Sequence, residues 1–222
     1  MLAAIETTGE TCGVALFEDD ILRVELHASF GREHDRLLAW MFAQALEIAR
    51  IRADEIESYA VSVGPGSYTG IRIGLSFAIG AALAHDRLII PVPTLDAIAY
   101  DVRDLGRVGH RSRVISLVPA GSAGLFAALY EVQPEFRRLT DIRSVSLEQI
   151  PPLLDENVFA AGPGASLVEA SCIDCVAVNS EILTARAVGR RALALRKSGV
   201  GCRPEEVEPL YISGLNIRKR GT

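Results

Sequence analysis

The chain has 222 residues, of which 49% are hydrophobic, 23% charged and 6% aromatic. This balance is typical of a globular protein and excludes an intrinsically disordered chain or a fibrous repeat. The length allows one medium domain or two small domains that share a core. The formal net charge of −5 argues against a large basic face, so strong RNA binding by this chain alone is not expected.

The start of the chain has no basic segment followed by a long apolar run, so no secretory signal peptide is expected. The longest apolar stretch, 71–84, is too short to span a bilayer and carries Arg72. We therefore expect a cytoplasmic protein away from membranes, with free thiols. Cys172 and Cys175 match a C-x-x-C redox or zinc half-site, but no His lies at metal-motif spacing, which favours buried or loop cysteines.

The first half of the chain alternates predicted strands and helices. Strands are expected at 1–6, 13–18, 21–27, 60–63 and 89–92, with a hairpin turn at 19–20. Helices are expected at 35–50, at 70–84 and from Thr94, the expected N-cap of a third helix. The charged stretch 100–112 is expected to connect two lobes.

The second half follows the same order. Strands are expected at 114–118, 125–132, 136–140 and 158–161, and helices at 166–170 and 182–197. A Gly-Pro-Gly turn stands between a strand and a helix in both halves, at 64–66 and 162–164. This echo predicts a duplicated α/β lobe, 1–105 and 106–222, with helices packed on mixed sheets.

The glycine-rich stretch 64–74 follows a predicted strand, where glycines allow a sharp turn and close backbone approach. No Lys follows Gly70, as a P-loop requires, and Thr69 stands where a dinucleotide fingerprint has Gly. Neither standard phosphate cradle is expected. A tight strand-to-helix turn is the alternative.

Two predicted helices, 35–50 and 70–84, have more apolar surface than a single small core could bury. In 70–84 the only polar side chains are Arg72 and Ser76, and the small residues at every fourth position form a ridge that another helix could approach. We interpret both helices as a partner interface, with burial in one large core as the alternative. The candidate interface residues are His34, Leu37, Leu38, Met41, Phe42, Ala45, Gly70, Arg72, Ile73, Gly74, Phe77 and Ala78.

The glycine-rich stretch, the start and the end of the chain resemble the TsaB family. Its signature is a Gly-Pro-Gly-Ser-aromatic-Thr-Gly-aliphatic-Arg-aliphatic-Gly run, which stands here at 64–74. The opening segment 5–20, His34 with the leucines that follow it, and the ending 208–214 are similar to the same family. The resemblance covers both ends and is most specific in the first hundred residues.

The resemblance implies a two-lobed fold of the actin, sugar kinase and Hsp70 type, formerly filed under the M22 glycoproteases. It implies a non-catalytic activator of threonylcarbamoyl transfer to adenosine 37 of ANN-decoding tRNAs. The implied partners are the catalytic paralogue TsaD and the ATPase TsaE, with tRNA reached only through the complex and a homodimer possible for the chain alone. The catalytic paralogue has a His-x-x-x-His metal pair where this chain has Thr94 and Ile98, so neither a metal nor a catalytic residue is expected.

No intrinsic cofactor is implied, although ATP or ADP could lie at the interface with the catalytic partner. The candidate nucleotide contacts are Thr7, Thr8, Gly64, Gly66, Ser67 and Thr69. Glu6 stands where the family has an Asp, which puts these nucleotide contacts in question. Two further departures make the second lobe more divergent and leave its surface function open: 119–121 replaces Asp-Ala-Arg, and no Arg accompanies Tyr211.

Two other function classes stay open. An ATP-dependent enzyme of the same fold, a small kinase or carbamoyl transferase, would use Glu6 with Thr7 and Thr8, unless these threonines only satisfy a turn. A protease would need a G-x-S-x-G or H-E-x-x-H motif, and the sequence has neither.

Overall fold

The computed structural model describes residues 1–29, 34–106, 113–121, 124–150, 158–169, 177–178 and 183–212. Cys172 and Cys175 lie outside the described residues. In the described part, Cys12 and Cys202 are free thiols. No helix there combines the length and the hydrophobicity needed to cross a lipid bilayer.

The first sheet contains the five strands expected in the first half of the chain. They are β1 (Leu2–Glu6), β2 (Cys12–Glu18), β3 (Ile21–Ala28), β4 (Ser58–Gly64) and β5 (Leu88–Pro93). Their order is β3-β2-β1-β4-β5. The first three strands pair antiparallel, and β1, β4 and β5 pair parallel.

The second sheet repeats this plan. Its strands are β6 (Arg113–Pro119), β7 (Leu125–Glu131), β8 (Arg137–Arg138), β9 (Arg143–Val145), β10 (Val158–Ala161) and β11 (Ala177–Val178). The order β11-β10-β6-β7-β8 has the same antiparallel and parallel pairings, and β9 also pairs with β7. The duplicated lobe is confirmed, while the boundary between 105 and 106 stays a prediction.

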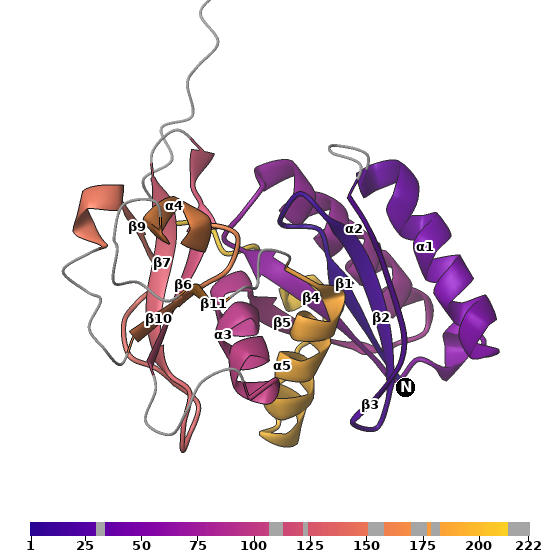
Figure 1. Ribbon diagram of the computed structural model, residues 1–222. Helices are drawn as coiled ribbons and strands as arrows, with labels where there is room; N and C mark the ends of the chain where they lie inside the picture. Colours follow the sequence, from indigo (N-terminus) through magenta and orange to yellow (C-terminus); the bar gives the residue numbers. More distant parts are fainter. Residues whose placement is uncertain are drawn as a thin grey trace, which may run out of the picture.

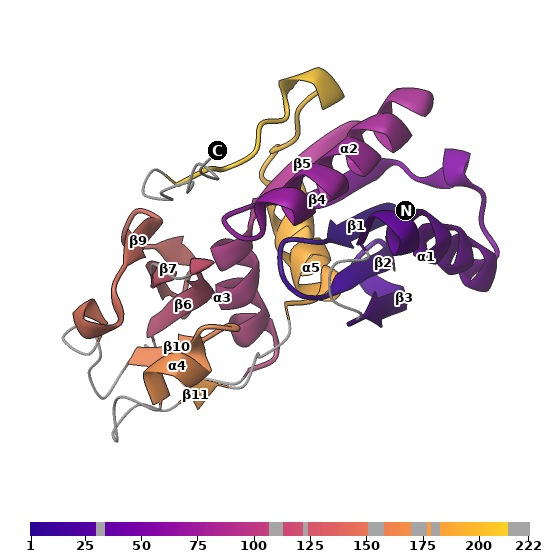
Figure 2. The same cartoon turned by 90° about the horizontal axis from the view of Figure 1, so that it is seen from above.

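The helices lie in layers around the two sheets (Figures 1 and 2). They are α1 (His34–Ala49), α2 (Tyr68–Ala84), α3 (Thr94–Asp104), α4 (Ala165–Glu169) and α5 (Ala185–Lys197). Short 3-10 helices lie at Ala53–Glu55, Leu147–Gln149 and Pro204–Glu206. Helices α1 and α2 cover the outer face of the first sheet, α3 and α5 lie between the sheets, and α4 covers the second sheet.

Helices on both faces explain why the central strand β1 is buried along its whole length. In β1, Ala3 and Ile5 pack with α1 and α2, whereas Leu2 and Ala4 pack in the layer of α3 and α5. Successive side chains of a strand point to opposite faces, so a strand that is buried on both faces needs an apolar residue at every position.

Two predictions about α3 are wrong. Thr94 is the first residue of the helix, Pro93 is the N-cap, and no side chain caps that end. The helix also continues to Asp104, so residues 100–104 of the stretch that we expected to be a connection are helical. Its apolar residues, such as Ile98 and Val102, are buried between the two sheets. This packing stabilises the helix and cannot be inferred from the local composition.

After α5 the chain returns to the first sheet. The backbone of Cys202 exchanges two hydrogen bonds with Ile89 of β5, with N···O distances of 2.9 and 3.0 Å. Further on, the Leu210 N–H donates to the Val63 carbonyl at 2.7 Å. These bonds place Tyr211 beside the first turn of α2.

Candidate functional site

The Gly-Pro-Gly turn connects β4 to α2. Gly64 has a φ of +110°, a left-handed conformation that favours glycine. A Cβ at this position would also lie 2.7 Å from the Leu210 carbonyl oxygen. Ser67 then caps α2 by accepting from the Gly70 N–H at 3.2 Å. The turn is therefore fixed both by backbone conformation and by the chain packed against it.

The loop after β1 packs directly on this turn. The Ser67 N–H donates to the Thr8 carbonyl at 2.7 Å, and the Thr7 hydroxyl donates to the Gly70 carbonyl at 2.7 Å. A Cβ at Gly66 or Gly70 would overlap the backbone of Thr8 or Thr7. These glycines thus allow two chain segments to approach each other closely.

Glu6 is a fully buried carboxylate at the end of β1. It accepts hydrogen bonds from the Thr8 N–H at 2.5 Å, from the Thr8 hydroxyl at 2.6 Å and from the Ser62 hydroxyl. Burial raises the pKa of Glu6 to about 7, although these hydrogen bonds act in the opposite direction. The same buried Thr8 hydroxyl lies 3.3 Å from that of Thr94.

The hydroxyls of Thr7 and Thr8 therefore have partners inside the protein, which fits the interpretation that they satisfy a turn. Glu6 is enclosed in the same way and offers no free carboxylate to a substrate. Of the other candidate nucleotide contacts, Ser67 and Thr69 are exposed. Binding of a nucleotide at this turn stays a prediction.

Two residues stand where, by the resemblance, the catalytic paralogue has its pair of metal-binding histidines. Thr94 and Ile98 are both buried. A Cβ at Gly162, in the second Gly-Pro-Gly turn, would lie 3.0 Å from Ile98 Cδ1. Within the residues that the structure describes, no group of three or more His, Cys, Asp or Glu side chains could hold a metal ion.

The ridge of small residues on α2 faces the chain's own sheet. A Cβ at Gly74 would meet the Thr7 hydroxyl, with Val61 Cγ2 at 3.5 Å and Ile5 Cγ2 at 3.7 Å. Eight of the twelve expected interface residues are buried in the first lobe, where they pack against the chain's own core, and the interface itself stays a prediction. The eight are His34, Leu38, Met41, Phe42, Ala45, Gly70, Gly74 and Ala78.

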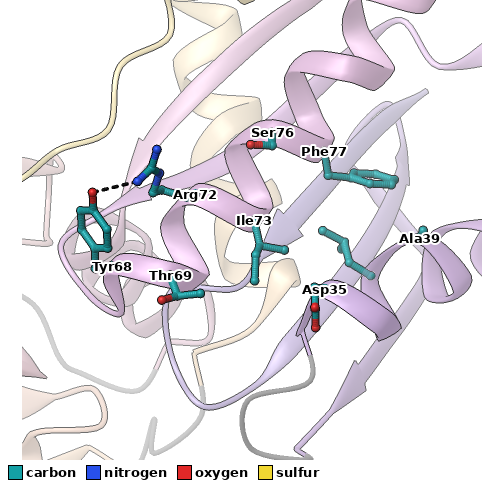
Figure 3. Close-up of a pocket in the computed structure, with 9 residues that line it drawn as sticks. Asp35, Ala39, Tyr68, Thr69, Arg72, Ile73, Ser76 and Phe77 are labelled. Carbon is teal, nitrogen blue, oxygen red and sulfur yellow. Dashed lines mark hydrogen bonds between the residues drawn. The ribbon is translucent and has the colours of Figure 1, made fainter.

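The exposed sides of α1 and α2 form a groove of about 580 Å³ (Figure 3). Half-buried Ile73 and Phe77 point from α2 into it. Phe77 packs edge-on against Phe42 with ring centroids 5.2 Å apart, which fixes its ring. The residues that line the groove are Asp35, Leu38, Ala39, Tyr68, Thr69, Arg72, Ile73, Ser76 and Phe77.

Arg72 is at one end of this groove and packs on the exposed ring of Tyr68. Its guanidinium donates to the Tyr68 hydroxyl at 2.9 Å, and Tyr68 stacks on Tyr211 with ring centroids 5.2 Å apart. Trp40 is also exposed, on α1. Neither tyrosine nor Trp40 was among the predicted site residues, although Tyr68 is the aromatic residue of the glycine-rich signature and Tyr211 lies in the ending 208–214 that resembles the family.

The family described as TsaD, tRNA N6-adenosine threonylcarbamoyltransferase, matches residues 18–142. The tRNA threonylcarbamoyladenosine biosynthesis protein TsaB of Escherichia coli K12 is 31% identical over 130 residues, or 59% of this chain. The chain belongs to this family, on its TsaB branch. The match spans about half, 54%, of the Escherichia coli protein.

Solved structures agree with the fold. YeaZ from Pseudomonas aeruginosa superposes with a TM-score of 0.85 at 25% identity, over 95% of this chain and 99% of that one. The ADPNP-bound activator of 2-hydroxyisocaproyl-CoA dehydratase from Clostridium difficile has a TM-score of 0.51 at 9% identity, covering 95% and 99%. The second likeness is one of fold alone. The two-lobed α/β fold of the actin and sugar kinase type is confirmed.

Proposed function

We propose that this chain is a non-catalytic subunit that activates threonylcarbamoyl transfer to adenosine 37 of ANN-decoding tRNAs in the cytoplasm. It acts by binding the catalytic paralogue TsaD through the α1–α2 groove, with the ATPase TsaE as a further member of the complex. It brings no cofactor of its own, and any ATP or ADP lies at the interface with the partner. The open groove between the two helices is the observation that carries this proposal.

The groove has the composition of a protein interface. Its centre is apolar, with Ile73 and Phe77, and its edge is polar, with Asp35, Thr69 and Arg72. Protein interfaces place apolar side chains at the centre and polar side chains around them. The exposed Trp40, with 61% of its surface accessible, extends the apolar surface of α1.

Activation requires that the groove distinguishes two states of the partner. Binding shifts the catalytic subunit to its competent conformation only if the groove binds that conformation more tightly than the idle one. Thr94 and Ile98 support a role of this kind, because they pack in the interior where the resemblance places the metal-binding histidines of the catalytic paralogue.

An Ile73→Glu variant tests the groove. We expect at least a roughly tenfold weaker affinity for the catalytic subunit, because a carboxylate would be desolvated at the centre of the contact. Calorimetry measures the affinity, and a reconstituted tRNA modification reaction measures activation. Leu83→Glu is the matched control, since Leu83 is exposed on the same helix and does not line the groove.

Wild-type affinity for the Ile73→Glu variant, with an unchanged circular dichroism spectrum, would contradict the proposal. Equal losses in both variants would also contradict it, because the effect would then not be specific to the groove. The chain alone is expected to self-associate weakly, since an exposed apolar groove favours pairing. Sedimentation velocity over a range of concentrations measures this.

A further inference from the structure

We propose that Tyr68, Arg72 and Tyr211 form a stacking surface for an unpaired base of the RNA substrate. This aromatic surface would give the chain a direct contact with RNA. The inference rests on the proposed function for the identity of the RNA, which is a tRNA held by the catalytic partner.

The aromatic surface is both exposed and fixed in place. Tyr68 and Tyr211 are 53% and 48% exposed, and their rings stack with an interplanar angle of 28°. The Arg72 guanidinium carbon lies 5.3 Å from the centre of the Tyr68 ring. Tyr68 belongs to the first turn of α2, and the bond from Leu210 to Val63 anchors Tyr211. Little side-chain entropy remains to be lost when a ligand stacks here.

The chemistry of the aromatic surface matches RNA. Tyrosine rings and arginine planes are the groups on which proteins stack unpaired bases, and each stacked base contributes about 1–3 kcal/mol. No carboxylate among the described residues pairs with Arg72, so its charge is available to a phosphate.

The position of the aromatic surface fits a substrate that the partner holds. Tyr68 and Arg72 also line the end of the α1–α2 groove, whereas Tyr211 does not. RNA bound to a protein in the groove would therefore reach the aromatic surface at the edge of that contact. One or two stacked bases give weak binding alone, so the contact contributes mainly inside the complex.

Tyr211→Ala separates the aromatic surface from the groove. The test is the RNA affinity, measured by fluorescence anisotropy of a labelled anticodon stem-loop RNA. It is measured with the complex, and with the chain alone at low salt. We expect at least roughly fivefold weaker RNA binding by Tyr211→Ala and unchanged affinity for the catalytic subunit. Tyr211→Phe keeps the ring and should bind RNA like the wild type. Leu83→Ala, an exposed apolar truncation elsewhere on α2, should change neither affinity.

Three results would overturn the inference. The first is wild-type RNA affinity of Tyr211→Ala and of Tyr68→Ala, with the fold of both checked by circular dichroism. The second is a loss of affinity for the catalytic subunit without a loss for RNA, which would make this a protein contact. The third is equal binding of a fully paired RNA duplex, because paired bases are not free to stack on side chains.

The two proposals can fail separately. If the chain does not bind the catalytic subunit, the proposed function fails, and the anisotropy of the chain alone still decides whether Tyr211 contacts RNA. If Ile73→Glu loses the partner while Tyr211→Ala keeps RNA affinity, the proposed function stands and the RNA contact is wrong.

Discussion

The hydroxyl oxygens of Thr8 and Thr94 lie 3.3 Å apart, although 86 residues separate them in the sequence. The Thr8 hydroxyl donates its one proton to Glu6, so Thr94 is the donor to Thr8. The Ser62 hydroxyl completes this buried network by donating to the same carboxylate. The first turn of α3 is thus bonded to the loop after β1.

Thr94→Val tests this bond. Valine keeps the shape and removes the donor, so we expect the free energy of unfolding to fall by about 1 kcal/mol. Urea denaturation at neutral pH measures the change. Thr69→Val, an exposed change at the start of α2, is the control and should have almost no effect. If the Thr94→Val protein is as stable as the wild type, the bond between α3 and the loop contributes nothing.

Two glycines of α2 should respond in opposite directions to the same substitution. At Gly74 a Cβ would collide with the Thr7 hydroxyl, so Gly74→Ala should lower the free energy of unfolding by about 1–3 kcal/mol. At Gly80 a Cβ meets nothing within 4 Å, so Gly80→Ala should raise it by about 0.5–1 kcal/mol. Thermal and urea unfolding measure both. A rise at both positions would show that helix propensity outweighs packing at Gly74, and a fall at both would show that Gly80 is packed more tightly than its surroundings suggest.

The ridge that includes Gly74 shows what sequence patterns can and cannot predict. Helical spacing correctly places the small residues on one face, because that depends only on the periodicity of the helix. It does not show which neighbour that face meets. The neighbour is β1 with its loop, which comes from more than 60 residues away, as the bond from Thr7 to Gly70 shows. The pattern alone therefore could not distinguish packing in the core from a partner interface, and the interface stays a prediction.

Most strands were predictable because their apolar runs are bounded by glycine, proline or charge, and burial on both faces makes the central runs nearly continuous. The short strands β9 and β11 were not predicted. The aromatic surface was not predictable in this way. Tyr68 and Tyr211 meet only because the segment after α5 returns to the first sheet, through contacts such as that of Leu210 with Val63. No local pattern in either segment encodes that return.

Arg72 should affect both proposed contacts. It lines the groove and also packs on Tyr68, so Arg72→Ala should weaken the binding of both the catalytic subunit and RNA, each by roughly threefold to tenfold. Arg72→Lys keeps the charge and loses the planar group, so it should recover partner binding more fully than RNA binding. Arg52→Ala, at an exposed arginine outside the groove, is the control. Unchanged affinities together with unchanged tRNA modification would leave Arg72 without a role in either contact.

Glu6 should make the stability of the protein depend on pH. Burial raises its pKa from 4.5 to about 7, so between these values the folded protein holds a proton that the unfolded chain releases. The stabilising contribution is complete below pH 4.5 and is lost as the pH rises through 7, at a total cost of up to about 3 kcal/mol. Glu6→Gln cannot titrate, so its unfolding free energy should fall less between pH 5 and pH 8 than that of the wild type. Urea titrations at intervals of one pH unit measure both curves, with the exposed change Glu10→Gln as the control. Parallel curves for the wild type and Glu6→Gln would mean that Glu6 is ionised throughout this range and that its hydrogen bonds outweigh its burial.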